Sequence, residues 1–442
     1  MPLVETEAPQ SVEFTEEEGR YLANLHKGNS VSAQDAMNEI FEQLGKNMTR
    51  SSNDLELTGI IYKEELGTPV HENLLPDTLA YSFESKSQGQ RYFVSADNRT
   101  RQSLLAMYDN TAKSEDFDYT SETIKDIIRK GIANCIYNDI INYELNKDSI
   151  LNEIRNKIEK IGIDSVQVIT RQQSLDPLDD NIMVNEYMIV NWHEVSFHDA
   201  LVTVEWGQNE PYNWGVKDTI YCEYGSVPTG CVPTAVAQYL SYWKYPLLIN
   251  GSLVNWDYLT ETSLILPSNY EKGIQVASLL KSVFIGCETK PGCDGSDSNI
   301  DKIGNYLMSI GFVVSNPISY SIDAINSSLA YSRPVIITGK NSSQEGHAWI
   351  IDGNQIQEGT VRKEIYAYDK RKKKWYLYSS IDSDCYRSFY HYNWGAKGVY
   401  NGWFSESCFD YKKGKNSLTR NTNLSNFEYE VKLLTNLHPI NE

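Results

Sequence analysis

A cysteine in a position suited to nucleophilic chemistry lies in the stretch VPTGCVPTAVAQYLSYWKYP, residues 227–246. Cys231 follows Thr-Gly and precedes an apolar run at helical spacing. Pro233 falls in the expected first turn, where its missing N–H costs no hydrogen bond. The unpaired N–H groups of a helix start favour an anion, so a cysteine there is expected to have a lowered pKa. Taken alone, the position still favours a buried structural cysteine.

A nucleophilic cysteine needs a base, and His347 is the histidine with the most suitable context. It follows Gly346 and opens the apolar, strand-like stretch AWIIDGN. Asn393, in HYNWGAKGVYNGWF, could accept the proton of the second ring nitrogen, and Trp394 beside it could keep water from that hydrogen bond. One at a time, these residues are better explained as core or turn residues. Their combination with Cys231 is what indicates a catalytic set.

The fourth requirement is a donor for the oxyanion that forms when a thiolate attacks a carbonyl. Gln208, in WGQNEPYN, could supply its side-chain amide together with the backbone N–H of Cys231. By itself Gln208 is no more than a loop amide in water. The order Gln, Cys, His, Asn along the chain is the order found in papain-like proteases.

The second half of the chain contains the elements that would position these residues. Helices are predicted at 232–243, 265–284 and 300–312. Strands are predicted after them, at 334–340, 347–354, 364–370, 374–380, 387–395 and 398–404. In the second helix, the apolar spacing predicts that Ile274, Leu279, Leu280 and Val283 are buried. Helices followed by an antiparallel sheet indicate an α+β fold.

The first half of the chain has its own pattern of elements. A short helix is predicted near 32–44 and a long one from about 121 to 160, where isoleucine recurs at three- and four-residue steps. Strands are predicted at 55–63, 79–85, 91–97 and 104–109, the middle two as a hairpin. An acidic, turn-rich link at 175–183 indicates a domain boundary between about 165 and 198.

Composition limits the class of protein. The 442 residues suggest two or three domains, and 40 % hydrophobic and 12 % aromatic content is typical of globular chains. The net charge of -19 argues against nucleic acid or an anionic membrane surface as the main partner. No apolar run reaches the roughly 18 residues of a membrane span. The acidic start lacks the pattern of a secretion signal, so the protein is either cytosolic or its export signal is absent from this chain.

The seven cysteines are few and odd in number, and no C-x-x-C pair is present, so a structural zinc site is not expected. Most are expected to be buried free thiols. Cys287 and Cys293 flank a Pro-Gly turn and could pair, although free thiols are favoured.

The stretches WGQNEPYN, TGCVPTAVAQYLSYWKYP, GHAWIIDG and HYNWGAKGVYNGWF resemble the motifs of streptopain-type (streptopain/interpain) cysteine peptidases, which belong to the papain-like superfamily. The resemblance covers about 200–435. It implies a papain-like catalytic domain at 191–442, behind an α+β inhibitory pro-domain at 1–190. The hairpin region LAYSFESKSQGQRYFVSADNRTRQSLLAMYD resembles part of the family's pro-domain more loosely.

The resemblance also implies roles for single residues. Cys231 matches the nucleophile, His347 the base and Gln208 the oxyanion donor, with Asn393 and Trp394 behind the histidine. Gly346 and Ser296 match positions that contact substrate. Three residues depart from the family pattern and line the expected cleft, which puts the substrate preference in doubt: Ala396, Lys397 and Asp297.

The implied function is a secreted or cell-surface cysteine endopeptidase made as a latent zymogen, whose export signal is absent from this chain. No metal or organic cofactor is expected. The expected partners are peptide substrates and the chain's own pro-domain, removed near Lys160, Arg171 or the link up to His198. Two alternatives stay open: a thiol amidase or acyl transferase on the same scaffold, and a non-catalytic surface binding protein. The polar stretch DKRKKKWYLYSSIDSDC is expected to form a longer hairpin between the His and Asn motifs.

Overall fold

A computed structural model of the chain gives the architecture. It describes residues 15, 17–18, 20–21, 24, 28–44, 54–67, 69, 71–109, 119–159, 182–223, 226–249, 251–293, 295–340, 346–369, 374–409 and 431–442. Most of the acidic link, and the expected processing neighbourhoods around Lys160 and Arg171, lie outside these residues. Within the described chain, no helix has a stretch long and apolar enough to span a membrane.

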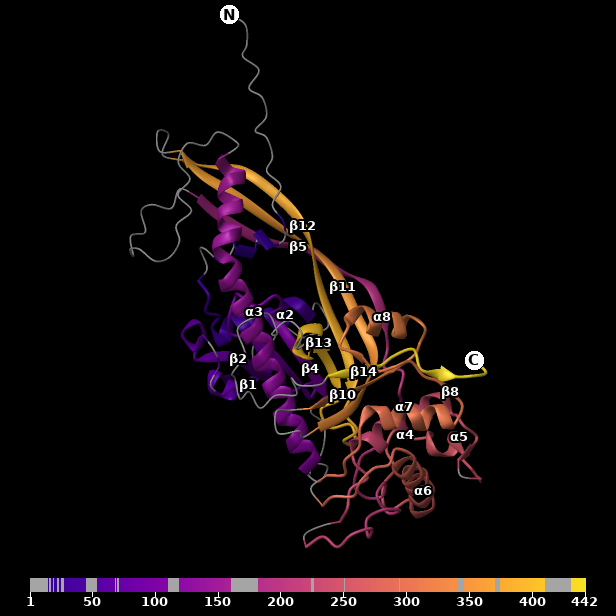
Figure 1. The fold of residues 1–442 in the computed structure, drawn as a ribbon. Coiled ribbons are helices and arrows are strands. Elements are labelled where there is room, and N and C mark those ends of the chain that lie inside the picture. The colour runs from indigo at the N-terminus through magenta and orange to yellow at the C-terminus, as the bar shows by residue number, and fades with distance from the viewer. Residues whose placement is uncertain are drawn as a thin grey trace, which may run out of the picture.

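The first half consists of two helices that cover a four-stranded antiparallel meander (Figure 1). The helices are α2 (Ala33–Leu44) and α3 (Tyr119–Glu159), and the strands are β1 (Leu55–Tyr62), β2 (Thr78–Ser85), β3 (Gln90–Ser95) and β4 (Leu104–Asp109). Short 3-10 turns, η2 (Lys63–Leu66) and η3 (Glu72–Leu74), connect β1 to β2. Strand β2 pairs with β3, which confirms the predicted hairpin.

The second half places its helices before its main strands, as predicted. The helices are α4 (Cys231–Trp243), α5 (Trp256–Leu259), α6 (Tyr270–Gly286), α7 (Ile300–Ser309) and α8 (Ile322–Ala330). The main strands are β5 (Ile182–His198), β10 (Val335–Lys340), β11 (Gly346–Asp369), β12 (Lys374–Asn393), β13 (Gly402–Ser405) and β14 (Lys432–Leu434). The minor elements are β6 (Leu248–Ile249), β7 (Ser252–Leu253), β8 (Phe312–Val313), β9 (Ile318–Ser319), η5 (Glu406–Phe409) and β15 (His438–Pro439).

One sheet runs through both halves of the chain. Its strand order is β1-β2-β3-β4-β13-β12-β11-β10-β14-β9, with β5 paired to β11. The halves join where β4 pairs antiparallel with β13, and Gly402 lies opposite Tyr108. A Cβ at position 402 would lie 2.5 Å from the carbonyl oxygen of Met107, so only glycine permits this close approach.

The sheet extends into a long ribbon made by β5, β11 and β12, which leaves the body toward the top of Figure 1. The strands predicted separately at 347–354 and 364–370 form the single strand β11, and those at 374–380 and 387–395 form β12. The expectation of separate strands was therefore wrong. Pairing with β5 on one side and β12 on the other keeps β11 extended between the two segments. The longer hairpin expected there is confirmed.

Among the described residues, two large apolar cores pack on the sheet, besides a smaller one between α2 and the strands of the first half. One lies between α3 and the sheet and combines residues of both halves, such as Ile132 with Trp394 and Phe409. The other surrounds α4, whose residues 232–241 are all buried. In α6, Leu279, Leu280 and Val283 are buried as predicted, but Ile274 is 46 % exposed. Ile274 lies one position past the buried Gly273, on the helix edge that turns to solvent.

Candidate active site

Cys231 is the first residue of α4, and the turn before it is tightly packed. Gly230 has φ 89°, and a Cβ there would lie 2.7 Å from the carbonyl oxygen of Ser296. The carbonyl oxygen of Gly230 accepts a hydrogen bond from Oγ1 of Thr234 at 2.9 Å. The backbone therefore enters α4 by a path that only glycine follows without strain, and this path fixes the position of the sulfur.

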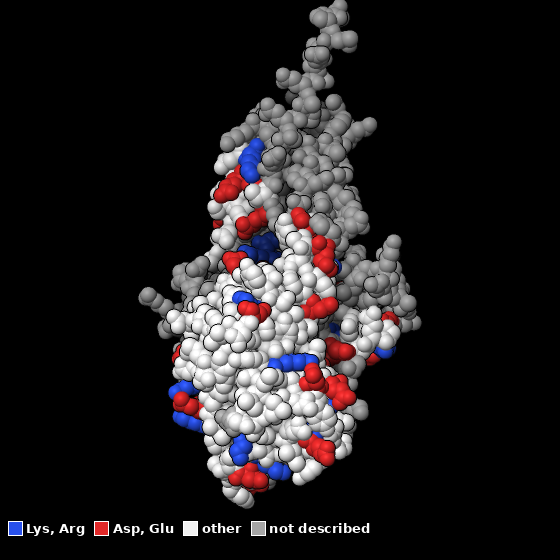
Figure 2. Space-filling model, turned by 90° about the vertical axis from the view of Figure 1, so that its right-hand side faces the viewer, with Lys and Arg blue, Asp and Glu red and all other residues white. Residues whose placement is uncertain are grey.

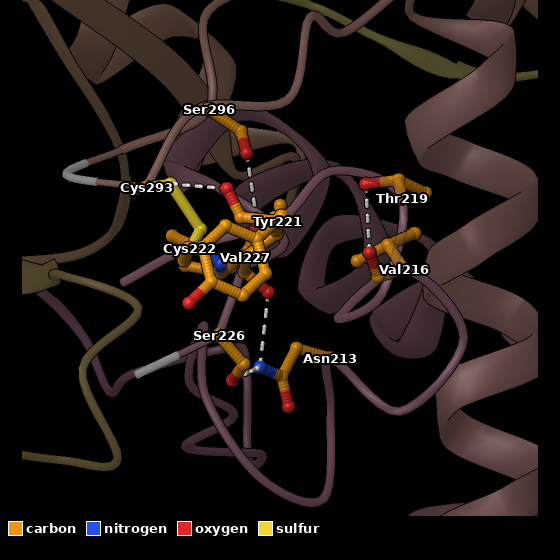
Figure 3. The surroundings of a disulfide bond; sticks show 10 residues. Asn213, Val216, Thr219, Tyr221, Cys222, Ser226, Val227, Cys293 and Ser296 are labelled. Atoms are coloured by element: carbon orange, nitrogen blue, oxygen red, sulfur yellow. Dashed lines mark hydrogen bonds between the residues drawn. A yellow bond between two sulfur atoms is a disulfide. The ribbon is translucent and has the colours of Figure 1, made fainter. Parts of the chain in front are cut away.

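A disulfide fastens the loop that faces this turn. Cys222 and Cys293 are bonded, and Ser296, three residues further on, donates its hydroxyl to the carbonyl oxygen of Pro228 at 2.7 Å. Figure 3 shows the disulfide and Ser296 against the segment that carries Tyr221 and Val227. The open possibility of a Cys287–Cys293 pair is wrong. Cys287 is a buried free thiol at the end of α6, since Cys222 takes the partner from another part of the chain.

His347 is the second residue of β11 and lies opposite Gly339 of β10. Its side chain is 5 % exposed and packs against both Trp349 and Trp394, with ring centroids 5.9 and 6.1 Å away. Its Nε2 lies 3.2 Å from the carbonyl oxygen of Trp394. The ring is thus held by aromatic packing and one backbone hydrogen bond.

Cys231 and His347 line the same cleft, which has a volume of about 440 Å³. Gly346 and Ser296, the two residues expected to contact substrate, line it as well. The hydroxyl of Ser296 is committed to Pro228, so Ser296 shapes the wall and offers no free hydroxyl to a ligand. The cleft brings together residues from the start of α4, the start of β11 and the loop before α7.

Both reactive groups are uncharged at neutral pH in this conformation. Burial raises the pKa of Cys231 to about 11, although the backbone N–H groups of Ala348 and Val232 and its own lower it. Burial lowers the pKa of His347 to about 4, with the Trp394 hydrogen bond acting in the opposite direction. The predicted lowering of the cysteine pKa is therefore wrong for this state, because loss of water outweighs the helix start.

Asn393 does not orient His347 in this arrangement. Its Oδ1 accepts hydrogen bonds from Nε2 of Gln238 at 3.1 Å and from the N–H of Gly395 at 3.2 Å, and its Nδ2 donates to Val204 at 2.8 Å. The expected Asn393–His347 hydrogen bond is absent among the described contacts, since the imidazole is turned to Trp394 instead. Trp394 itself is fully buried beside the ring, as expected.

Gln238 is a site residue that the motifs did not reveal. Besides holding Asn393, its Oε1 accepts the backbone N–H of Trp206 at 2.8 Å. It thereby joins α4, the end of β12 and the segment that leads to Gln208. The available signal was an amide two helical turns after Cys231 in a mostly apolar helix, and such an amide needs hydrogen-bond partners when it is buried.

Gln208 lies beside the turn that precedes Cys231. Its carbonyl oxygen accepts hydrogen bonds from the N–H and Oγ1 of Thr229, at 2.9 and 3.1 Å. Within the described ranges its side-chain amide has no hydrogen-bond partner, but Gln208 is buried and is not among the residues that line the cleft. In the same ranges, no three His, Cys, Asp or Glu side chains gather in a way that could hold a metal ion.

Comparisons with known proteins point to one family. The model described as Peptidase C10 family matches residues 206–404, a span that contains all four expected catalytic positions. Among solved structures, a mutant fragment of Prevotella intermedia prointerpain A is 18 % identical, with TM-score 0.46, covering 80 % of this chain and 94 % of that one. Active Prevotella intermedia interpain A cysteine protease is 20 % identical, with TM-score 0.36, covering 55 % and 95 %. No curated protein matches.

Proposed function

We propose that the chain, whose residues 206–404 match the Peptidase C10 family model, is the latent precursor of a secreted or cell-surface cysteine endopeptidase of that family. Cys231 is its nucleophile and His347 its base. The observation that carries this assignment is the shared cleft, which has the helix-start sulfur and the strand-start imidazole in its lining.

The proposed reaction is acyl transfer to water. The Cys231 thiolate attacks the peptide carbonyl carbon, and the oxyanion is held by Gln208 Nε2 and the N–H of Cys231. His347 in its imidazolium form then protonates the leaving amine, and water, deprotonated by the neutral ring, hydrolyses the thioester. Loss of one such oxyanion donor typically costs about 3 kcal/mol of transition-state stabilisation.

The proposed latency follows from the same residues. A thiol with a pKa near 11 and an imidazole with a pKa near 4 form no ion pair at neutral pH. Activation therefore requires that His347 leave the carbonyl oxygen of Trp394 and turn to Cys231. With the ring in that position, Oδ1 of Asn393 would accept a hydrogen bond from His347 in addition to the one it accepts from Gln238.

The first half of the chain is proposed to hold this latent state as a pro-domain. Gly131 of α3 packs so closely on Phe409 that a Cβ would lie 2.9 Å from the ring, and Phe409 contacts Trp394 with centroids 5.7 Å apart. Packing is thus continuous from α3 to the tryptophan that holds His347. We place the boundary between Glu159 and Ile182, because β5 pairs with β11 over its whole length and would be divided by a boundary at 190.

The test is incubation of the purified chain, with N-terminal sequencing of the products. We expect the wild-type chain to cut itself before β5 and then to hydrolyse peptides, and the Cys231→Ala chain to do neither. Cys287→Ala, which removes a buried thiol outside the cleft, is the matched control and should process normally. A peptidyl thiol-trapping reagent should label Cys231 in the processed form. Cleavage by the Cys231→Ala chain would contradict the assignment of Cys231 as the nucleophile. No cleavage and no labelling of the wild-type chain would favour a binding protein.

A further inference from the structure

The lining of the cleft carries a net negative charge. Three charged side chains line the cleft: Asp297 and Asp301 on the loop and first turn of α7, and Lys432 on β14. In the part of the chain that the structure describes, none of the three has an ion-pair partner within 4 Å. Other exposed carboxylates of this half do, such as Glu210 with Lys217 and Glu261 with Lys272.

Asp297 is held in a fixed position beside the nucleophile. Its N–H and C=O both pair with the backbone of Lys290, at 3.0 and 2.8 Å, and Ser296 before it is anchored to Pro228. Its carboxylate is close enough to the thiol that its negative charge helps to raise the pKa of Cys231. A carboxylate there opposes formation of the thiolate, so its presence needs another explanation.

Local structure explains Asp301 but not Asp297. Asp301 lies in the first turn of α7, behind the cap that Asn299 provides, where an acidic side chain stabilises the helix. Asp297 precedes that cap, and its side chain makes no hydrogen bond to the described residues. Lys302 is engaged by Glu288 at 2.6 Å, and Lys432, which lines the same cleft, does not come within 4 Å of the Asp297 carboxylate. The carboxylate of Asp297 is therefore left for a group from outside the chain.

We propose that Asp297 is a specificity-determining residue that selects substrates with a Lys or Arg side chain in the cleft beside Cys231; this inference rests on the peptidase function proposed above. A substrate cation would form a charge-assisted hydrogen bond with the carboxylate, bidentate in the case of arginine. It would also offset the negative charge beside the sulfur, so substrate binding itself would favour the thiolate. On the face shown in Figure 2, acidic and basic side chains are interspersed.

The experiment uses the full chain after its own processing and a set of quenched fluorogenic peptides. Each position near the scissile bond carries in turn Lys, the neutral Gln, or Glu. We expect one position at which kcat/KM for Lys exceeds that for Gln roughly tenfold, the size of one charge-assisted hydrogen bond. In Asp297→Asn this ratio should fall to near one, and in Asp297→Lys the same position should prefer Glu.

Asp323→Asn is the control, since it removes the same charge from the first turn of α8, outside the cleft lining. It should keep the Lys preference, which separates the local carboxylate from the net charge of -19. Peptide cleavage without any preference for Lys, or a preference that Asp297→Asn retains, overturns this inference and leaves the peptidase function standing. Failure to cleave every peptide, with no labelling of Cys231, overturns both.

Discussion

The imidazole of His347 is bound to the backbone of Trp394, its Nε2 lying 3.2 Å from the carbonyl oxygen, and not to the side chain of Asn393. Trp394 thus holds the ring both by stacking and by a hydrogen bond. Because that carbonyl can only accept, Nε2 carries the proton and the ring is neutral in its resting form. In the proposed activation, release of this contact is the step that frees the ring to turn toward Cys231.

The stability of the latent chain is predicted to depend on His347 below neutral pH. Its pKa is 6.5 when unfolded and about 4 when folded, so between these values the unfolded chain binds a proton that the folded chain does not. Stability is therefore fully present above about pH 6.5 and lost as pH falls toward 4, by roughly 3 kcal/mol at most. Urea unfolding of Cys231→Ala and Cys231→Ala/His347→Gln at pH 7 and 4.5 measures this. An equal loss in both chains would show that other groups cause the pH dependence.

Gly230→Ala is predicted to lower stability and activity by more than the strain of a positive φ angle alone explains. The substitution places a Cβ 2.7 Å from the carbonyl oxygen of Ser296 at φ 89°. Gly251→Ala is the matched control, because Gly251 has φ 76° and nothing within 4 Å. The control should lose about 1 kcal/mol of stability and keep its activity. Gly230→Ala should lose more, with at least a tenfold drop in kcat/KM after processing. Similar values for the two variants would disprove the tight packing.

Gln238→Leu is predicted to lower both stability and activity. It leaves the buried N–H of Trp206 without its acceptor and removes one of the two donors to Oδ1 of Asn393, which keeps the N–H of Gly395. A buried polar group left without a partner costs about 1 to 3 kcal/mol, so the free energy of unfolding should fall by roughly that amount. Gln275→Leu, on the exposed face of α6, should change it by less than about 0.5 kcal/mol. Chemical denaturation of the two variants in the Cys231→Ala background measures the free energy of unfolding. An equally small decrease in both would contradict the role of Gln238.

The disulfide Cys222–Cys293 is predicted to stabilise the catalytic half. It joins residues separated by 71 positions, and chain entropy assigns a loop of that length about 4 kcal/mol. Thermal unfolding of the Cys231→Ala chain should shift to lower temperature when a reducing agent is added. The same chain with Cys222→Ser and Cys293→Ser should unfold at that lower temperature with or without the agent. A reductant effect that persists in this variant would assign it to another thiol.

Sequence predicted the features that depend on neighbours along the chain. Gly230 and Pro233 mark the start of α4, which begins at Cys231. The isoleucine spacing gave the extent of α3 to within a few residues, and β4 has the predicted bounds of 104–109. These signals are local because caps, turns and periodicity act over one or two turns of backbone.

The features that sequence missed depend on contacts between distant residues. Gln238 meets Asn393 across 155 positions, and Cys222 finds Cys293 instead of the adjacent Cys287. The resting pKa of Cys231 was predicted with the wrong sign, since burial is set by segments that fold over the cysteine from elsewhere. Periodicity and spacing do not predict these long-range contacts, because the chain contains many residues of the same type that could form them.

The join between β4 and β13 has a consequence for the protein once its first half has been removed. Strand β13 then loses the partner that satisfies its backbone at Gly402–Phe404, and an uncovered strand edge accepts any extended peptide, including one from a second copy. The apolar surface under α3 is bared at the same moment. If the first half is removed as proposed, the remaining protein exposes both a strand edge and an apolar surface, and we expect aggregation to limit its handling at temperatures below its thermal unfolding.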